Sequence, residues 1–349
     1  MREPLDVARY IFMNGEDELR SGWRVLAFAF FFILVIALLT APIAVLGILF
    51  PSLRFLLDQP PESDALSARA LIYSYSDNLR SLTAAVIASA ISARLLERRS
   101  LASIGFKLHR HWHKDFLIGS GMGAAALAIA VGIITSLGAL TFGVQNRDPA
   151  SLARGFLIAC FFFLIAAATE ELIFRGFPFQ ALVHNVGGLA AVAITSLVFG
   201  LAHFANPSAS VFSTINTILA GVWLGIAYLM TRSLWLATAL HFSWNFAMVF
   251  IFGLPVSGIT ALEQTAWLRG YPSAPQWISG GSYGPEAGAA ATVALILSTL
   301  VIWKSGLFTP SEDMLAAIQH GKREPALISV VPDELLSTEA GPRPDLGQK

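Results

Sequence analysis

Charged residues are scarce in this chain of 349 residues. They make up 13% of it, whereas hydrophobic residues make up 55%. A soluble domain usually carries about 25% charged residues. The deficit, a mean hydropathy of +0.64 and several long apolar runs together predict a polytopic membrane protein. The net charge is zero, so the composition gives no support for nucleic acid or an acidic partner.

The chain has little cysteine and lacks two protease motifs. The single cysteine, Cys160, lies inside an apolar run. The chain therefore has neither an intramolecular disulfide nor a thiolate metal site, and we interpret Cys160 as a packing residue. No H-E-x-x-H motif and no pair of aspartates within an apolar run occur. These absences argue against zincin and aspartyl protease mechanisms.

What the chain has instead is a series of apolar runs. They predict an all-α fold, a polytopic membrane helix bundle of about eight transmembrane helices. The first run, residues 25–50, exceeds the roughly 7–15 apolar residues of a cleavable signal peptide, so we expect it to remain as a helix. The second contains Asp77 and Arg80, which can pair at a spacing of three residues. The predicted spans are 25–50, 71–95, 116–139, 154–182, 188–205, 210–230, 233–252 and 287–304.

Basic residues predict the orientation of these spans. They crowd the segment before the first span, the loop between the second and third, and the turn at Arg232. The positive-inside rule then places both termini in the cytoplasm. We divide the chain into a cytoplasmic segment (1–24), two helices with a basic loop (25–115), a core (116–305) and a polar tail (306–349). A short helix is expected in the tail near Met314–Gln319.

Two adjacent glutamates at the end of the fourth span are the most informative feature. An ionised carboxylate costs roughly 2.5–3.5 kcal/mol at the centre of a membrane helix, so it is tolerated where it is paired, hydrated or reactive. Glu171 and Arg175 are four residues apart and meet on one helix face. Arg175 therefore holds Glu171 and leaves Glu170 freer to exchange a proton. Taken alone, the motif fits a structural ion network equally well.

Three further polar residues lie within later spans. His203 follows Phe199 and precedes Asn206-Pro207, and His241 and Asn245 share one face of the seventh span. If the turn after the fourth span centres on residues 186–188, Glu170 and His203 both lie roughly 24 Å from it. His241 and Asn245 approach the same depth from the turn at Arg232.

Groups of this kind, gathered at one depth, predict a reactive site. A carboxylate and an imidazole can deprotonate a water molecule, and a second imidazole and an amide can donate hydrogen bonds to an oxyanion. That set is suited to hydrolysis of an amide bond without a covalent intermediate.

The three motifs E-E-x-x-x-R, F-x-x-x-H and H-x-x-x-N, in this order on successive spans, resemble the CPBP family. This family contains the type II CAAX prenyl endopeptidases and bacteriocin-processing or immunity proteins, and is also called Abi. The segments Gly280-Gly-Ser-Tyr-Gly-Pro-Glu286 and Ser103-Ile-Gly-Phe106 are similar to segments of bacterial members. The resemblance covers about residues 116–305.

The resemblance implies an intramembrane endopeptidase that cleaves a CAAX-like or hydrophobic membrane-associated protein or peptide. It implies Glu170 as the base that activates water, with His203 assisting, and His241 and Asn245 as the oxyanion hole. Glu171 and Arg175 would support them. Glu170, His203 and His241 are also a set that can hold Zn²⁺, while the glutamate mechanism needs no ion.

Other interpretations remain open at this point. A bacteriocin-immunity or partner-binding membrane protein would use the same cavity without catalysis, and a transporter would use such groups as a proton relay. A transporter is disfavoured because no internal symmetry is visible. We expect a multi-pass protein of the bacterial inner membrane whose partners are the lipid bilayer and a membrane-anchored substrate.

Overall fold

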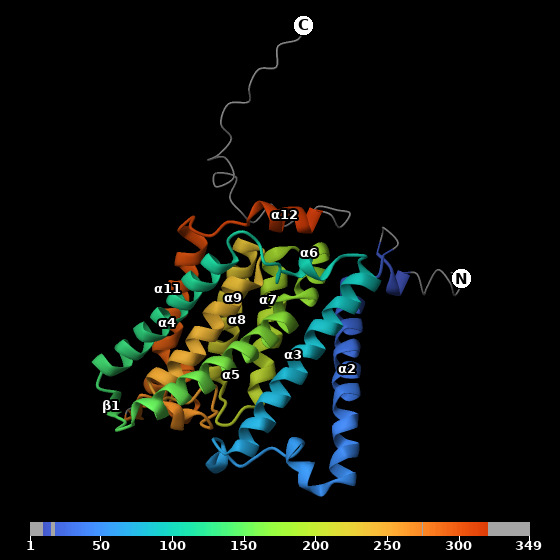
Figure 1. Cartoon of the computed structure of the whole chain (residues 1–349). Helices are drawn as coiled ribbons and strands as arrows, with labels where there is room; N and C mark the ends of the chain where they lie inside the picture. The colour runs from blue at the N-terminus through green and yellow to red at the C-terminus, as the bar shows by residue number, and fades with distance from the viewer. Residues whose placement is uncertain (1–9, 15–17, 274, 320–349) are drawn as a thin grey trace.

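Helices make up most of the structure, a computed structural model that describes residues 10–14, 18–273 and 275–319 (Figure 1). Strands β1 (Leu140–Val144) and β2 (Leu268–Pro272) pair antiparallel, with Leu140 opposite Pro272 and Val144 opposite Leu268. In chain order the helices are α2 Ser21–Leu49, α3 Ala68–Leu96, α4 Trp112–Ser136, α5 Pro149–Arg175, α6 Phe177–Val186, α7 Gly188–Ala202, α8 Val211–Thr231, α9 Leu234–Phe246, α10 Gln276–Ser279, α11 Ala289–Lys304 and α12 Glu312–Gln319.

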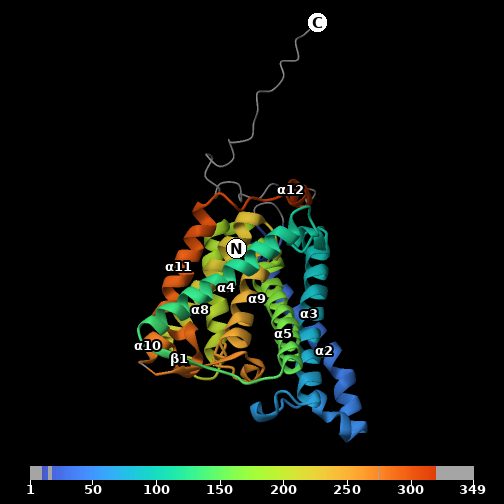
Figure 2. The same ribbon diagram turned by 60° about the vertical axis from the view of Figure 1, so that its left-hand side comes forward.

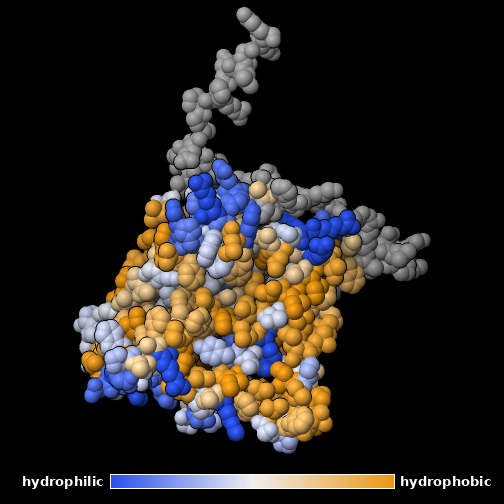
Figure 3. All heavy atoms as spheres, viewed as in Figure 1, coloured by the Kyte–Doolittle hydropathy of each residue, from blue (hydrophilic) through white to orange (hydrophobic). Residues whose placement is uncertain are grey.

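The bundle has the hydropathy of a membrane protein. Within the described ranges, seven helical segments are long and apolar enough to cross a membrane, and α11 is a shorter apolar helix of 16 residues. Figure 3 shows hydrophobic side chains over the side of the bundle and hydrophilic ones gathered at its upper end and lower edge. The predicted all-α polytopic bundle is confirmed. The cytoplasmic location of the termini stays a prediction, and residues 1–9 and 320–349 of the predicted end segments lie outside the described residues.

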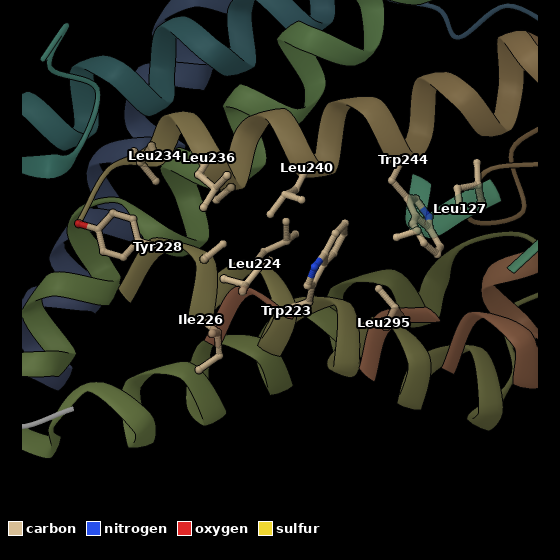
Figure 4. Close-up of a cluster of buried hydrophobic side chains, with 14 of the residues drawn as sticks. Leu127, Trp223, Leu224, Ile226, Tyr228, Leu234, Leu236, Leu240, Trp244 and Leu295 are labelled. Atoms are coloured by element: carbon tan, nitrogen blue, oxygen red, sulfur yellow. The ribbon is translucent and has the colours of Figure 1, made fainter. Parts of the chain in front are cut away.

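The centre of the bundle is formed by α4, α8, α9 and α11, whose large side chains interdigitate (Figure 4). Glycines let the helix backbones approach closely. A Cβ atom on Gly119 or Gly123 of α4 would collide with α9, and one on Gly221 of α8 would collide with Ser196 of α7. Glycines spaced four residues apart, as at Gly119 and Gly123, permit the close helix packing that is common in membrane bundles.

Helices α2 and α3 form a pair at the right of the bundle in Figures 1 and 2. At their upper end, Arg24 is buried and pairs with Glu18 at 2.9 Å and Glu97 at 3.1 Å. Helix α2 starts at Ser21, earlier than residue 25, so Arg24 belongs to its first turn. In the N-terminal third of α3, the Tyr75 hydroxyl donates to the Ile158 carbonyl of α5 at 2.6 Å.

The predicted fourth span, 154–182, is not one helix. Helix α5 ends at Arg175 and α6 restarts at Phe177, because Pro178 has no N–H to donate to the preceding turn. Gly176 joins the two with φ −75° and ψ −130°, and a Cβ there would collide with the Leu172 carbonyl. Because of this break, the depth of Glu170 cannot be calculated from a continuous rise of about 1.5 Å per residue. The turn at Gly187 and the helix end before Pro207 fall where predicted.

Candidate active site

A cavity of about 300 Å³ lies among α3, α5, α7, α8, α9 and the loop that precedes α11. Glu170, His203, His241 and Asn245 all line it, so the structure brings these four predicted residues together. Glu171 and Arg175 do not line it and are fully buried behind its wall. The other polar lining residues are Asn78, Asn206, Asn216, Thr217, Ser257 and Glu286.

Glu170 stands between the two histidines. Its Oε2 atom lies 3.8 Å from His203 Nε2 and 3.8 Å from His241 Nε2. That atom is buried and has no hydrogen-bond partner among the described residues, whereas the glutamate side chain as a whole is 33% exposed. Distances of this size are too long for direct hydrogen bonds and suit a bridging water molecule.

Each imidazole is held at its other nitrogen. His203 Nδ1 lies 2.8 Å from the Phe199 carbonyl oxygen, and His241 Nδ1 lies 2.9 Å from Glu171 Oε1. Since both partners are acceptors, we assign the proton to Nδ1 in both rings. In the neutral rings, Nε2 then presents a lone pair towards Glu170. The Phe199 carbonyl and the Glu171 carboxylate thus fix the orientation of the two rings.

The ion pair predicted between Glu171 and Arg175 is present. Arg175 Nη1 donates to Glu171 Oε1 at 2.8 Å, and Nη2 donates to the Gly221 carbonyl at 3.1 Å. The guanidinium carbon lies 4.6 Å from the centre of the Phe199 ring. Glu171 Oε1 therefore bridges Arg175 and His241, so the ion pair fixes the position of an imidazole in the cavity.

The sequence interpretation gave no role to several lining residues. Glu286 accepts a hydrogen bond from Trp244, and Asn78 reaches the cavity from α3. The segment that contains Glu286 resembles part of the CPBP family, but nothing in its pattern shows that the loop folds back into the bundle. Trp244 lies one residue before Asn245 and reads as an ordinary apolar position.

Gly280-Gly-Ser-Tyr-Gly284 has the G-x-S-x-G spacing of serine hydrolases. In those enzymes the serine sits on a strand-to-helix turn with a histidine partner. Here Ser282 lies in a 3₁₀ turn, Gly281–Tyr283, and borders a pocket that no histidine or carboxylate lines. The spacing is therefore not a nucleophile elbow.

The possibility of a metal site depends on three groups that suit Zn²⁺ chemically, Glu170, His203 and His241. In the part of the chain that the structure describes, no group of three or more His, Cys, Asp or Glu side chains has the geometry to hold a metal ion. The three residues as arranged do not fit an ion, so no step is assigned to zinc below.

Comparison with protein families identifies a match over residues 152–247 to the type II CAAX prenyl endopeptidase Rce1-like family. The matched region contains all six predicted site residues and leaves out α2, α3 and α4. No curated protein and no solved structure matches the chain. At the level of the family, the match supports a CAAX-type intramembrane protease. The resemblance found in the three motifs is thus confirmed over residues 152–247, which match the Rce1-like family.

Proposed function

We propose that this protein is an intramembrane endopeptidase that hydrolyses a peptide bond of a membrane-associated protein or peptide with water activated by Glu170 and His203. The observation that carries the proposal is the position of Glu170 Oε2, 3.8 Å from Nε2 of both His203 and His241, in a cavity within membrane-spanning helices. A structural ion network does not need this arrangement, because Arg175 already neutralises Glu171.

In the first step, Glu170 takes a proton from a water molecule that also hydrogen-bonds to His203. The resulting hydroxide attacks the carbonyl carbon of the scissile bond, and the carbonyl oxygen gains a negative charge. Hydrogen-bond donors that are already oriented toward that oxygen lower the barrier. Glu170 then passes its proton to the leaving amine, which separates the two products.

The oxyanion is stabilised by the Asn245 amide and by His241. Because Nδ1 of His241 is committed to Glu171, Nε2 donates only when the ring is the imidazolium. Glu171 is the counterion of that imidazolium, and Arg175 holds Glu171 in place. This assigns a supporting role to the buried pair.

The substrate reaches the cavity from the membrane. A hydrophobic or CAAX-like segment of a membrane-anchored protein has the apolar character that the lining demands, with Phe162, Phe163, Leu224 and Leu295 among its walls. We place the protein in the bacterial inner membrane as a multi-pass protein.

Reconstitution into liposomes with a prenylated or hydrophobic C-terminal peptide tests this function. Glu170→Gln and His203→Ala are expected to lower turnover by at least about 10³-fold while the thermal unfolding temperature is retained. Glu312→Gln, which removes an exposed carboxylate on α12, is the matched control and should keep full turnover. Cleavage that persists in Glu170→Gln would reject Glu170 as the base.

Two further results would change the proposed function. A chelator is expected to leave turnover unchanged, and a loss that Zn²⁺ restores would show that a metal ion takes part. Peptide binding without cleavage by the unsubstituted protein would favour a partner-binding or immunity protein over an enzyme.

A further inference from the structure

Glu286 is the second carboxylate of the cavity and plays no part in the proposed hydrolysis. Its Oε1 accepts from Trp244 Nε1 at 3.2 Å, and its Oε2 accepts from Ser257 N at 2.7 Å and Ser257 Oγ at 2.8 Å. The two oxygens of an ionised carboxylate accept about four hydrogen bonds. Three are occupied, so Oε1 retains one position for a donor in the cavity.

The backbone around Glu286 is fixed from α8. Asn216 Nδ2 donates to the Glu286 carbonyl at 2.7 Å and to the Gly288 carbonyl at 3.0 Å, and its Oδ1 accepts from Thr292 at 2.7 Å. Asn216 itself is 1% exposed. A side chain held in this way does not have to be ordered when a ligand binds, which favours binding.

Glu286 has no basic partner in the cavity. The lining includes Glu170 and Glu286 but neither lysine nor arginine, and its two histidines lie beside Glu170. Arg175 is paired with Glu171 behind the wall, and Arg80 of α3 is paired with Asp77 and is not a lining residue. Among the described residues, no lysine or arginine forms an ion pair with Glu286.

Two indole rings form part of the wall. Trp223 and Trp244 line the cavity with ring centroids 5.8 Å apart. Both are almost fully buried, at 2% and 4% exposed, and Trp244 turns its N–H towards Glu286. Glu286 is therefore the group that would attract an ammonium or guanidinium side chain and disfavour an anion.

From this arrangement we infer that the cavity selects its substrate by charge, with Glu286 as the residue that determines specificity. The inference depends on the proposed hydrolysis. The substrate segment that lies beside Glu286 carries a lysine or arginine side chain. An acidic side chain is disfavoured at the same position.

Charge-dependent labelling tests the cavity without requiring catalysis. Ala220 of α8 lines the cavity one helical turn from Asn216, and Cys160→Ala removes the native thiol. In Cys160→Ala/Ala220→Cys, the rates of reaction with aminoethyl, ethyl and carboxyethyl methanethiosulfonate are measured in liposomes. Relative to the same ratio for a free thiol, we expect the aminoethyl reagent to be favoured over the carboxyethyl reagent by at least about tenfold.

Three variants separate the effect of the Glu286 charge from the effect of its hydrogen bond with Trp244. Glu286→Gln should remove most of this preference, because it keeps the shape of the side chain and removes its charge. Trp244→Phe should retain the preference, because it removes one hydrogen bond to Glu286 and leaves the charge. Glu312→Gln on α12, at the upper end of the bundle in Figure 1, should also retain it.

The inference is wrong if the reagents react in the free-thiol ratio, if Glu286→Gln leaves the ratio unchanged, or if the cysteine reacts with none of them. Peptides that differ in one residue, lysine, norleucine or glutamate, then test the same preference in cleavage. We expect the lysine peptide to be cleaved fastest and the glutamate peptide slowest. Failure to cleave any peptide would count against the hydrolysis, whereas the labelling ratios would still decide the charge selectivity.

Discussion

At the scale of single residues, Arg175 connects stability to the candidate chemistry. It is fully buried, and its partner Glu171 also holds His241. Arg175→Ala would leave a buried carboxylate without its counterion, which typically costs about 3–5 kcal/mol. We expect a marked fall in the thermal unfolding temperature together with a loss of turnover. Arg54→Ala, which breaks the exposed pair with Asp58, is the control and should cost less than about 1 kcal/mol. An unchanged unfolding temperature for Arg175→Ala would contradict a stabilising role of the buried pair.

The sequence predicted the convergence of Glu170, His203, His241 and Asn245 because each is a polar residue in an apolar run, where an unexplained polar group is conspicuous. Glu286 was not predicted to join them. It lies in a loop rich in glycine and proline, where a carboxylate is expected to face water, and its burial depends on Ser257 and Asn216 from distant segments. Asn78 was not predicted for a similar reason, because which side of α3 faces α5 depends on the packing of the helices.

At the scale of helices, the close contact of α4 with α9 positions His241 and Asn245. A Cβ atom at Gly123 would collide with the Leu240 carbonyl and Ser243 Oγ of α9. Gly123→Ala should therefore push α9 away and lower both stability and turnover. Gly121→Ala is the matched control on the same helix, because nothing lies within 4 Å of its Cβ position. It should be neutral or stabilise α4 by up to about 1 kcal/mol, since alanine favours helix more than glycine. Equal effects in the two variants, measured by thermal unfolding and peptide cleavage, would argue against this packing role.

The loop before α4 provides a pH-dependent contact. His109 is buried, its Nε2 lies 3.0 Å from Ser233 Oγ, and burial lowers its pKa below the ordinary value of 6.5. The unfolded chain therefore binds this proton more readily than the folded one. The contribution of His109 to stability is present above about pH 6.5 and is lost as the pH falls through the lowered pKa.

We expect His109→Gln, which keeps a polar partner for Ser233 but does not titrate, to show a shallower loss of stability between neutral and acidic pH. His111→Gln, which alters an exposed histidine two residues away, should keep the slope of the unsubstituted protein. Thermal unfolding measured at several pH values checks both. If His109→Gln and the unsubstituted protein have the same slope, the buried ring does not set the acid sensitivity.

Hydropathy predicted the helices better than their ends or breaks. Long apolar runs locate α2, α3 and α8 to within a few residues, because burial in lipid requires them to be continuous. The break at Gly176 was missed, since a glycine two residues before Pro178 does not interrupt the apolar run. The π-helical turn Ala247–Ile251 after Asn245 also depends on tertiary contacts and has no signature in the sequence.

For the whole molecule, the end that carries α12 is rich in basic residues. Lys107 donates to the Asp313 carbonyl at 2.9 Å, and the buried Arg24 lies at the same end. Arg147 and Arg269 lie at the opposite end, beside β1 and β2. The positive-inside rule predicts that the α12 end faces the cytoplasm.

A fluorescent protein fused after Lys349 should therefore fluoresce in a bacterial host, and alkaline phosphatase inserted after Arg147 should be active in the periplasm. A fluorescent protein inserted after Arg147 is the reciprocal control and should remain dark. The opposite pattern of reporter activity would show that the α12 end faces the periplasm.

Helix α3 lies outside the Rce1-like region, yet it supplies Asn78 to the cavity wall and is attached to α5 by the Tyr75 hydroxyl. The reacting groups and part of the enclosure around them thus belong to separate stretches of chain. We expect a chimera with the α2–α3 hairpin of another Rce1-like protein to keep the proposed hydrolysis and to act on a different membrane-associated substrate. The hairpin would then be a part of the enclosure that can be exchanged without altering the reacting groups.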